Sequence, residues 1–405
     1  MAPVSYWSSS VSMNISRLAP VAVLAVLAAN QSFAASPFDV RGFGAVGDGA
    51  VNDTATIQSA ISAAANSGGG EVLLTGGTFL CGSLFLESNV TLHIAADATL
   101  KASPDRADYN AADVCPQNWT SEAESNSGAH LLLCIGKTNV TVRGEGRIDG
   151  NSPAFLLGPD GKPWPGGSRG IPWRPGQMLY FVESDGVRIE GLTLENAPYW
   201  SCFLHGCTHV SAHGLTVRTI RRPFHTHNGD GIDIDCCEDV DVSDCDIDTA
   251  DDSITLRADA AHLQTRRPCA NVRVHDCRLS SGCNAIRVGV GDGEVRDASF
   301  QNIRIRGTRT AINIVGAWLR GSRGVDVRRI SFEDFDLEAR NFCHLYYKHS
   351  TESVFEDILF RHIRGKVSDP SVFDDTSERP FRNLVFEDVS LVGETSPRVV
   401  SPAMP

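Results

Sequence analysis

The chain has 405 residues, which is long enough for two or three ordinary domains, although a solenoid of this length can form a single unit. Its 42% hydrophobic and 21% charged residues are typical of a soluble protein. A formal net charge of −13 argues against a nucleic-acid partner, which would need a basic face, and it gives no long-range attraction for a polyanion.

The first predicted element is a secretory signal peptide at residues 1–35. An apolar run at 18–29 follows Arg17, is too short to span a bilayer comfortably, and leads into small residues with a cleavage site near Ala34. We therefore expect a secreted protein, extracellular or periplasmic, without a membrane span. A buried helix is the alternative interpretation of this run.

The cysteines agree with that location, because their number, 12, is even and such usage suits an oxidising compartment. Cys245 and Cys277 occupy the same place in two successive repeats. Stacked core thiols and a disulfide both fit that spacing.

Residues 54–67 are the one segment with helical periodicity, since Ile57, Ile61 and Ala64 fall on one face. A helix at this position would cap the open end of a solenoid. Two later segments, 103–130 and 152–177, are predicted to be long loops. The second contains tryptophan and is either one wall of a groove or a simple surface excursion.

From residue 187 onward, one pattern recurs along the chain. The clearest copies are VRIEGLTLE (187–195), VSAHGLTVR (210–218), VDVSDCDID (240–248) and VRVHDCRLS (272–280). We place less regular copies at 295–303, 325–333, 355–363 and 381–389. Each copy has apolar residues with a period of two, broken by Gly, Asp or Asn, which is the pattern of short strands and turns.

Short β-rich repeats bury their apolar faces by stacking as coils. Leucine-rich repeats would show regular leucine spacing, and a propeller would need a longer period with antiparallel hairpins. The sequence therefore predicts an all-β, single-domain, right-handed parallel β-helix (a solenoid) over residues 36–400, with a short N-terminal capping helix.

Candidate catalytic residues follow from the register of four short strands. Ile232, Ile254, Ile286 and Ile312 are expected to stack in the interior on consecutive coils. Asp230 and Asp252 each precede such an isoleucine by two residues, so they should lie one above the other, roughly 4.8 Å apart along the coil axis. Asp251 adjoins them.

Three carboxyl groups in one exposed patch repel each other, so the pKa of at least one of them should rise, which separates a protonated acid from ionised bases. That division suits the cleavage of a glycosidic bond. A solvated acidic turn and a calcium site are the structural alternatives.

The same register predicts further side chains on the outer wall. Asp233, Thr255, Arg287 and Asn313 form one row, and Asp235 and Arg257 form another. His205 belongs to the coil before them. His225, His227 and Asn228 lie in the turn that leads to Asp230.

The sequence resembles the polygalacturonase family, glycoside hydrolase family 28. The motifs are FDVRGFGAVGDGAVNDTATIQSAI (38–61), GEGRIDGN (144–151), RPGQMLYF (174–181), NAPYWS (196–201), NGDGID (228–233) and ADDS (250–253). The resemblance covers about residues 37–395. It implies an inverting hydrolase of a pectic polymer or oligosaccharide, with no metal or other cofactor. By position, Asp251 would be the general acid, and Asp230 and Asp252 would activate water.

Two family motifs are replaced. The stretch in which the family carries G-H-G contains Gly282-Cys283-Asn284 here, and we place Asn284 at the position of the catalytic histidine. The uronate-gripping R-I-K reads Asn313-Ile314-Val315.

Several arginines are available to replace the lost uronate clamp. Arg257, Arg287 and Arg309 would bind a carboxylate, bind neutral hydroxyl groups, or pair with Asp233 and Asp235. The predicted substrate-binding set is His205, His227, Asn228, Asp233, Arg257, Asn284, Arg287, Arg309 and Asn313.

Three functions stay open on the sequence alone. The first is an inverting hydrolase that acts as a monomer on a carbohydrate polymer or oligosaccharide. The second is a polysaccharide lyase, for which Arg287 is the obvious base. The third is a non-catalytic carbohydrate-binding β-helix, which the loss of the histidine at position 284 favours.

Overall fold

The computed structural model describes residues 36–221, 228–318, 323–350, 352–374, 381–393 and 398–400. The predicted signal peptide, His225 and His227 lie outside the described residues. Among the described residues, no helix is long and apolar enough to cross a membrane.

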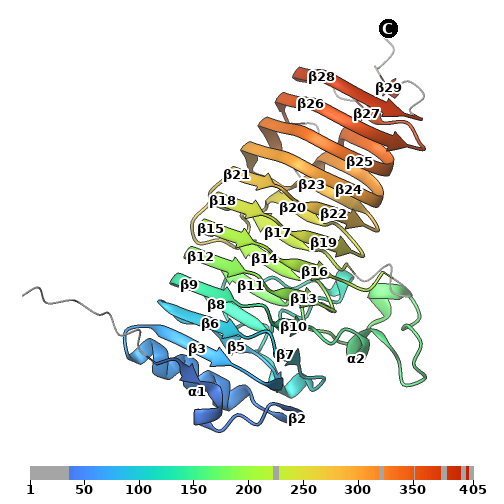
Figure 1. The fold of residues 1–405 in the computed structure, drawn as a ribbon. Coiled ribbons are helices and arrows are strands. Elements are labelled where there is room, and N and C mark those ends of the chain that lie inside the picture. The colour runs from blue at the N-terminus through green and yellow to red at the C-terminus, as the bar shows by residue number, and fades with distance from the viewer. Residues whose placement is uncertain are drawn as a thin grey trace, which may run out of the picture. The chain divides into compact units, whose positions relative to one another are not determined.

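The described chain is a right-handed parallel β-helix, which confirms the predicted fold class. Every coil contributes a strand to up to three parallel stacks, which we call sheets 1, 2 and 3 (Figure 1). The chain passes from sheet 1 to sheet 2 to sheet 3 in each turn. In the later coils, β24 (Glu294–Ala317) and β25 (Asp326–Lys348) run through all three sheets as single long strands.

Sheet 1 contains β1 (Phe38–Asp39), β3 (Gly70–Leu74), β6 (Val90–Ile94), β9 (Thr138–Arg143), β12 (Asp185–Glu190), β15 (Thr208–His213), β18 (Glu238–Ser243), β21 (Cys269–His275), β26 (Phe355–Val367) and β28 (Arg382–Val392), together with the first parts of β24 and β25. Sheet 2 contains β2 (Asp48–Asn52), β4 (Gly77–Cys81), β7 (Ala98–Ala102), β10 (Arg147–Asp149), β13 (Thr193–Glu195), β16 (Thr216–Arg218), β19 (Asp246–Thr249) and β22 (Arg278–Ser281). Sheet 3 contains β5 (Leu84–Phe85), β8 (Leu132–Ile135), β11 (Leu179–Val182), β14 (Cys202–His205), β17 (Ile232–Asp235), β20 (Ile254–Ala258), β23 (Asn284–Gly291), β27 (Val372–Asp374) and β29 (Arg398–Val400).

The predicted helix is α1 (Thr54–Asn66), and it packs on the first coil as expected. Ile57, Ala60, Ile61 and Ala64 are fully buried against β1, β3 and β5. This packing covers apolar surface that the first coil would otherwise expose. The other short helices are η1 (Val40–Phe43), η2 (Arg106–Asp108), η3 (Glu122–Glu124), α2 (Pro153–Leu156) and η4 (Gly167–Gly170).

The interior is built of columns of like side chains. Ile232, Ile254, Ile286 and Ile312 pair in register on consecutive coils and are fully buried, as predicted. In later coils a phenylalanine column runs through sheet 1, and its successive rings lie 5.0 Å apart (Phe300, Phe332, Phe360, Phe386). Identical spacing from coil to coil lets these side chains pack in regular stacks.

The corner that leads into sheet 1 is set by a column of residues with positive φ. Asn89, Asn139, His209, Asp239, Asn271, Asp297, Arg329, Asp357 and Asn383 have φ between 52° and 62°. Asn and Asp tolerate this left-handed conformation better than other residues with a Cβ atom. The side chains also bond along the column, since Asn271 Nδ2 donates to Asp239 Oδ1 at 3.1 Å.

This column corrects the phase of the later repeats. Val272 pairs with Ala298, and the following equivalents are Ile330, Ile358 and Leu384 rather than the predicted starts at 295, 325, 355 and 381. The valines and phenylalanines at the predicted starts were misleading, because the residue with positive φ that precedes each strand marks the true phase.

The two corners of each coil before sheet 3 differ in length. Between sheets 1 and 2 the turn has two or three residues in most coils, such as Gly191-Leu192 and Gly214-Leu215 with two and 144–146 with three, and the first coil has a longer connection at 40–47. Both predicted long loops, 103–130 and 152–177, lie instead between sheets 2 and 3. A third long connection, from residue 219 to 231, occupies the same corner.

The buried cysteines of the core are thiols rather than disulfides. Cys245 and Cys277 face each other on successive coils, as predicted, and neither is oxidised. Cys202, Cys207 and Cys237 are likewise buried thiols. These cysteines act as small apolar side chains in the core.

We predict that Asn271→Ala lowers the free energy of unfolding by about 1–2 kcal/mol, because alanine pays the cost of the left-handed conformation. Asn271→Gly should lose less, since glycine adopts positive φ freely. Urea unfolding of both variants measures the difference. Equal losses would show that the corner does not depend on the backbone conformation of this residue.

Candidate active site

Two adjoining hollows lie on the outer side of sheet 3, next to its corner with sheet 2. The larger has a volume of ≈ 570 Å³ and the smaller ≈ 170 Å³. Of the predicted residues, the larger is lined by Asn228, Asp251, Asn284, Arg287, Arg309 and Asn313. The smaller is lined by Asn228, Asp230, Asp251, Asp252, Arg257 and Arg287. Asp251, Asn228 and Arg287 line both, so they lie where the two hollows meet.

The three predicted acids are brought together by hydrogen bonds between neighbouring coils. Ser201 N–H donates to the Asp230 carbonyl at 2.9 Å, and Gly231 N–H donates to the Asp252 carbonyl at 2.9 Å. The coils approach so closely that a Cβ atom on Gly231 would lie 2.3 Å from the Ser253 carbonyl oxygen. Glycine therefore permits the approach that stacks Asp230 on Asp252.

Asp252 is almost fully buried, and its carboxylate accepts three hydrogen bonds. Asn284 donates to Oδ1 from its backbone N–H at 3.2 Å and from Nδ2 at 2.5 Å. Arg287 Nη1 donates to Oδ2 at 3.0 Å. These three hydrogen bonds fix the position of the Asp252 carboxylate. Asn313 in turn donates to Asn284 Oδ1 at 3.0 Å, which fixes the orientation of that amide.

The other two acids are shifted toward the protonated form. Burial, and then the charge of Asp252, raise the pKa of Asp251 to about 6. Burial also raises the pKa of Asp230 well above its ordinary value, with further contributions from Asp251, Asp233 and Asp252. The pKa values of Asp230 and Asp251 are thus raised by burial and by the carboxyl groups around them.

His205 and Asp233 lie behind the lining of the hollows, and this corrects the expectation that both face a groove. The exposed fractions of their surfaces are 4% and 0%. Asp233 has no hydrogen-bond partner among the described residues, and burial raises its pKa to about 8. Phe203 stacks on His205, with ring centroids 5.1 Å apart.

Behind the lining, Asp235 joins two predicted residues. Arg257 Nε donates to Asp235 at 3.2 Å, and His205 Nδ1 lies 3.6 Å from the same carboxylate. Although burial favours the neutral acid, His205 and Arg257 hold the pKa of Asp235 below its ordinary value. The Arg257 guanidinium is therefore already paired.

Tryptophans form part of the walls. Trp119, Trp200 and Trp318 line the smaller hollow, and Trp318 also lines the larger one. The Arg257 guanidinium lies 4.7 Å from the Trp200 ring centre, and that of Arg287 lies 4.6 Å from the Trp318 ring centre. Trp318 is 46% exposed, so a large flat apolar surface is open to a ligand.

The first long loop lines the hollows through Trp119 and Glu124. The second long loop, 152–177, contributes none of the described residues that line them, so it does not form the groove wall that was one of its two interpretations. Trp164 packs beside Leu156 and Ile171, and Trp173 packs on Tyr109 and Phe155.

The second loop acts through Arg174, which is buried. Arg174 donates to the Pro198 carbonyl at 2.7 Å, to the Ser125 carbonyl at 3.3 Å and to Asn228 Oδ1 at 3.3 Å. This side chain ties the first loop to the edge of the hollows.

Sequence reasoning missed the residues of the coil after Asn313. Arg340, Asn341, His344 and Tyr346 all line the larger hollow. Asn313 pairs with His344, and Val315 pairs with Tyr346. Extending the register by one more coil would have identified them. Trp119 and Glu124 carried no such signal, because a loop has no register.

Asp251, Asp252 and Cys283 offer ligand atoms within 4.8 Å of one another, a spacing that a cation could use. However, Arg287 donates to Asp252 at 3.0 Å, and Arg309 Nη2 lies 2.6 Å from Cys283 Sγ. These guanidinium groups occupy two of the three ligands and supply positive charge, so the residues present fit a metal ion poorly.

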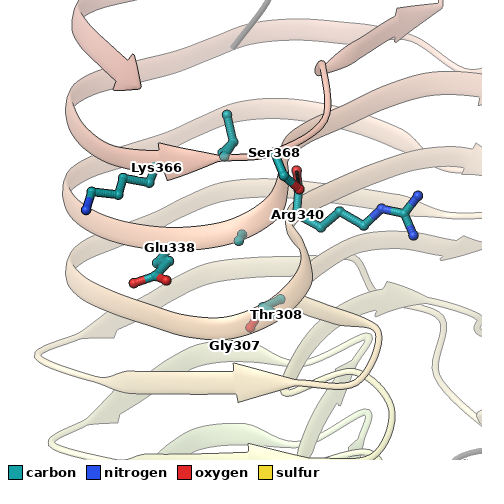
Figure 2. Close-up of a pocket in the computed structure, with 8 residues that line it drawn as sticks. Gly307, Thr308, Glu338, Arg340, Lys366 and Ser368 are labelled. Carbon is teal, nitrogen blue, oxygen red and sulfur yellow. Dashed lines mark hydrogen bonds between the residues drawn. The ribbon is translucent and has the colours of Figure 1, made fainter. Parts of the chain in front are cut away.

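A third hollow of ≈ 450 Å³ lies beyond the larger one and shares Arg340 with it. Figure 2 shows Glu338 and Lys366 on one side of this hollow, with the Arg340 side chain extending away from them. Arg340 pairs with Asp369. Among the described residues of the predicted set, only Arg309 lies near this end of the site. Arg309 is the neighbour of Arg340 on the preceding coil.

Three comparisons with known proteins bear on the site. The model of glycosyl hydrolases family 28 matches residues 90–401. The chain is 28% identical over 222 residues to a probable polygalacturonase of Vitis vinifera, covering 53% of this chain and 43% of that protein. It is 24% identical over 307 residues to a probable polygalacturonase of Arabidopsis thaliana, covering 74% and 58%. The chain thus spans about half the length of these relatives.

Among solved structures, the fold resembles that of a hyperthermoactive exopolygalacturonase from Thermotoga maritima. The TM-score is 0.70 and the identity 19%, over 87% of this chain and 86% of that one. At this identity the likeness concerns the fold.

We predict that Asp251→Asn makes the protein more stable at neutral pH. Because the pKa of Asp251 is about 6 in the folded state and 3.8 in the reference state, this group favours folding below about pH 4, and its contribution is lost as the pH rises through 6. Urea unfolding at pH 4.5 and 7.5 should show a gain of roughly 1–2 kcal/mol at the higher pH. Asp160→Asn, an exposed loop control, should show none; identical behaviour of the two variants would contradict the prediction.

Proposed function

The chain belongs to glycosyl hydrolases family 28, and from this membership we propose that it hydrolyses glycosidic bonds of a pectic polysaccharide or oligosaccharide with inversion of configuration. The names of the relatives, polygalacturonases, support a pectic substrate. The N-terminal apolar stretch, which lies outside the described residues, is the basis for proposing action outside the cytoplasm.

One observation carries the proposal: Asp251, whose pKa is raised, adjoins the hydrogen-bonded Asp252 where two hollows meet. The raised pKa of Asp251 keeps its proton available near pH 6, while Asp252 is held by Arg287 and Asn284. A general acid works best when its pKa is near the working pH. Because Asp251 lines both hollows, a sugar on either side of it has its linking oxygen within reach.

The proposed reaction is a single displacement. Asp251 gives its proton to the glycosidic oxygen as the bond between that oxygen and C1 breaks. A water molecule bonds to C1 from the opposite face, and Asp252 accepts a proton from it, while Asp230 orients the water. The proton on Asp252 then returns to Asp251. Acid and base in inverting sites are commonly separated by roughly 6.5–9.5 Å, whereas carboxylate oxygens of Asp251 and Asp252 lie within 4.8 Å of each other, so the anomer of the product is the decisive measurement.

Asn284 takes a different part from the histidine that the family carries. It cannot exchange a proton at ordinary pH, but it donates two hydrogen bonds to Asp252. We propose that Asn284 and Arg287 are positioning residues that keep the Asp252 carboxylate oriented. Proton transfer then rests on the aspartates alone.

A lyase reaction on the same fold needs a free base near the sugar and commonly a metal-bound uronate. Arg287, the candidate base, is engaged with Asp252 and with the Trp318 ring. This engagement disfavours the lyase. Absorbance at the unsaturated-uronide band, with and without a chelator, separates the two reactions.

We predict that Asp251→Asn lowers turnover of pectic oligosaccharides by at least about 10³-fold, because the leaving oxygen loses its proton donor. Reducing-sugar release measures turnover, and NMR of early products should show an inverted anomer in the wild type. Circular dichroism controls for folding. Activity near that of the wild type in this variant, or a retained anomer, would end the proposed mechanism.

We also predict that Arg287→Ala lowers kcat/KM by about 10²-fold and moves the basic limb of the pH–rate profile to higher pH, since the charge of Arg287 lowers the pKa of the proposed acid Asp251. Arg287→Lys keeps that charge and should recover part of the activity. A kinetic profile that Arg287→Ala leaves unchanged would remove this residue from the site.

A further inference from the structure

Arg309 differs from the other arginines of the site in its partners. Arg257 pairs with Asp235, Arg287 with Asp252, and Arg340 with Asp369. Within the described part of the chain, Arg309 has no carboxylate partner, and its recorded bond is to Cys283 Sγ. Its side chain is exposed and lines the larger hollow. A guanidinium has five donors, so most of those on Arg309 are available.

The two hollows differ in charge. The smaller one is lined by Glu124, Asp230, Asp251, Asp252 and Asp259, and both of its arginines are paired with aspartates. The larger one is lined by two acids, Glu124 and Asp251, and by three arginines. Arg287 and Arg340 are paired with aspartates, whereas Arg309 has no carboxylate partner among the described residues. A carboxylate on a bound ligand would therefore be repelled by the smaller hollow and attracted by the larger one.

Register places Arg309 close to the reacting position. Asp252, Asn284 and Thr310 follow one another on consecutive coils, so Asp251, Cys283 and Arg309 form the adjacent column. The Arg309 backbone lies two coils from Asp251, roughly 10 Å along the axis. Its guanidinium reaches back over one of these coils to Cys283.

Neutral groups beside Arg309 also lack partners. Asn313 is 6% exposed, and its Oδ1 has no hydrogen-bond partner among the described residues; the same holds for His344 Nε2. Burial, with the charge of Arg309, lowers the pKa of His344, which is therefore neutral at pH 7. Both groups line the larger hollow and suit the hydroxyl groups of a sugar.

We infer that Arg309 binds the carboxylate of a uronic acid residue in the larger hollow, next to the scissile bond, and that the smaller hollow takes a sugar ring without a free carboxylate. This inference rests on the proposed function. It selects Arg309 from the three arginines that the sequence offered, because the other two are paired, and it gives the uronate a place different from the replaced R-I-K position.

The chemistry of recognition is a planar guanidinium facing a planar carboxylate, with two parallel hydrogen bonds. Thr310 and Asn341, on neighbouring coils beside Arg309, add polar groups without charge. Lysine would keep the charge but lose the paired geometry, so Arg309→Lys should bind less well than the wild type and better than Arg309→Gln.

We test the inference by binding, in the Asp251→Asn background so that no ligand is cleaved. The probes are a trigalacturonate and its carboxyl-reduced counterpart, titrated by calorimetry. We expect the acid to bind better than the reduced sugar, and Arg309→Gln to weaken the acid at least about tenfold with little effect on the reduced sugar. Arg304→Gln, an exposed arginine on the same strand, removes the same charge away from the site and should change neither.

The outcomes are distinct. Equal weakening of both ligands by Arg309→Gln, or no weakening of the acid, overturns the role of Arg309. Equal binding of acid and reduced sugar by the parent protein overturns the uronate subsite. Selective acid binding through Arg309 without any hydrolysis by the wild type would support the inference and refute the proposed function.

In the protein that keeps Asp251, Arg309→Gln should lower kcat/KM for the free acid at least about tenfold more than for the reduced sugar. A substrate with a free carboxylate on the Arg309 side only should be cleaved faster than one with carboxylates on both sides. Preference for the doubly acidic substrate would contradict the assignment of the smaller hollow.

Discussion

The regular spacing of coils is the constraint on which the rest of this molecule depends. Each coil hydrogen-bonds to the next in a fixed register, so residues at equal positions in successive coils are brought to the same place, about 4.8 Å apart. Inside, this produces the isoleucine and phenylalanine columns. Outside, it produces columns of polar residues, and the acidic patch is one of them. The same geometry that packs the core therefore also forces Asp230 and Asp252 together against their mutual repulsion.

The repulsion is offset to a different degree at each aspartate, and this difference is the basis of the proposed acid–base chemistry. Asp252 has a guanidinium and an amide as partners, whereas Asp230 and Asp251 have burial and neighbouring negative charge. In the proposed mechanism, this difference in surroundings lets one aspartate act as the acid and another as the base.

Much of this could be predicted from the sequence, since a register is a property of the sequence. The isoleucine column, the row through Asp233, Thr255, Arg287 and Asn313, and the stacking of the two aspartates all follow from counting residues along short strands. The phase of the later repeats was wrong, because an apolar residue looked like a strand start and the preceding residue with positive φ was not used.

Burial was harder to predict than register. His205 and Asp233 face the expected side of the sheet, yet both are covered, and the alternation along a single strand does not show how deeply a side chain is buried. Trp119 and Glu124 come from a loop, whose path depends on tertiary contacts such as those of Arg174. For this reason, the loop residues that form the walls of the site could not be predicted from the sequence.

The unequal corners of the coil have a bearing on how such proteins diversify. The corner between sheets 1 and 2 is short in most coils, with two or three residues. The opposite corner already holds connections of very different length while the strands on both sides keep their register. Insertions can therefore accumulate there during evolution and reshape what surrounds a ligand, while the inherited acids keep their places.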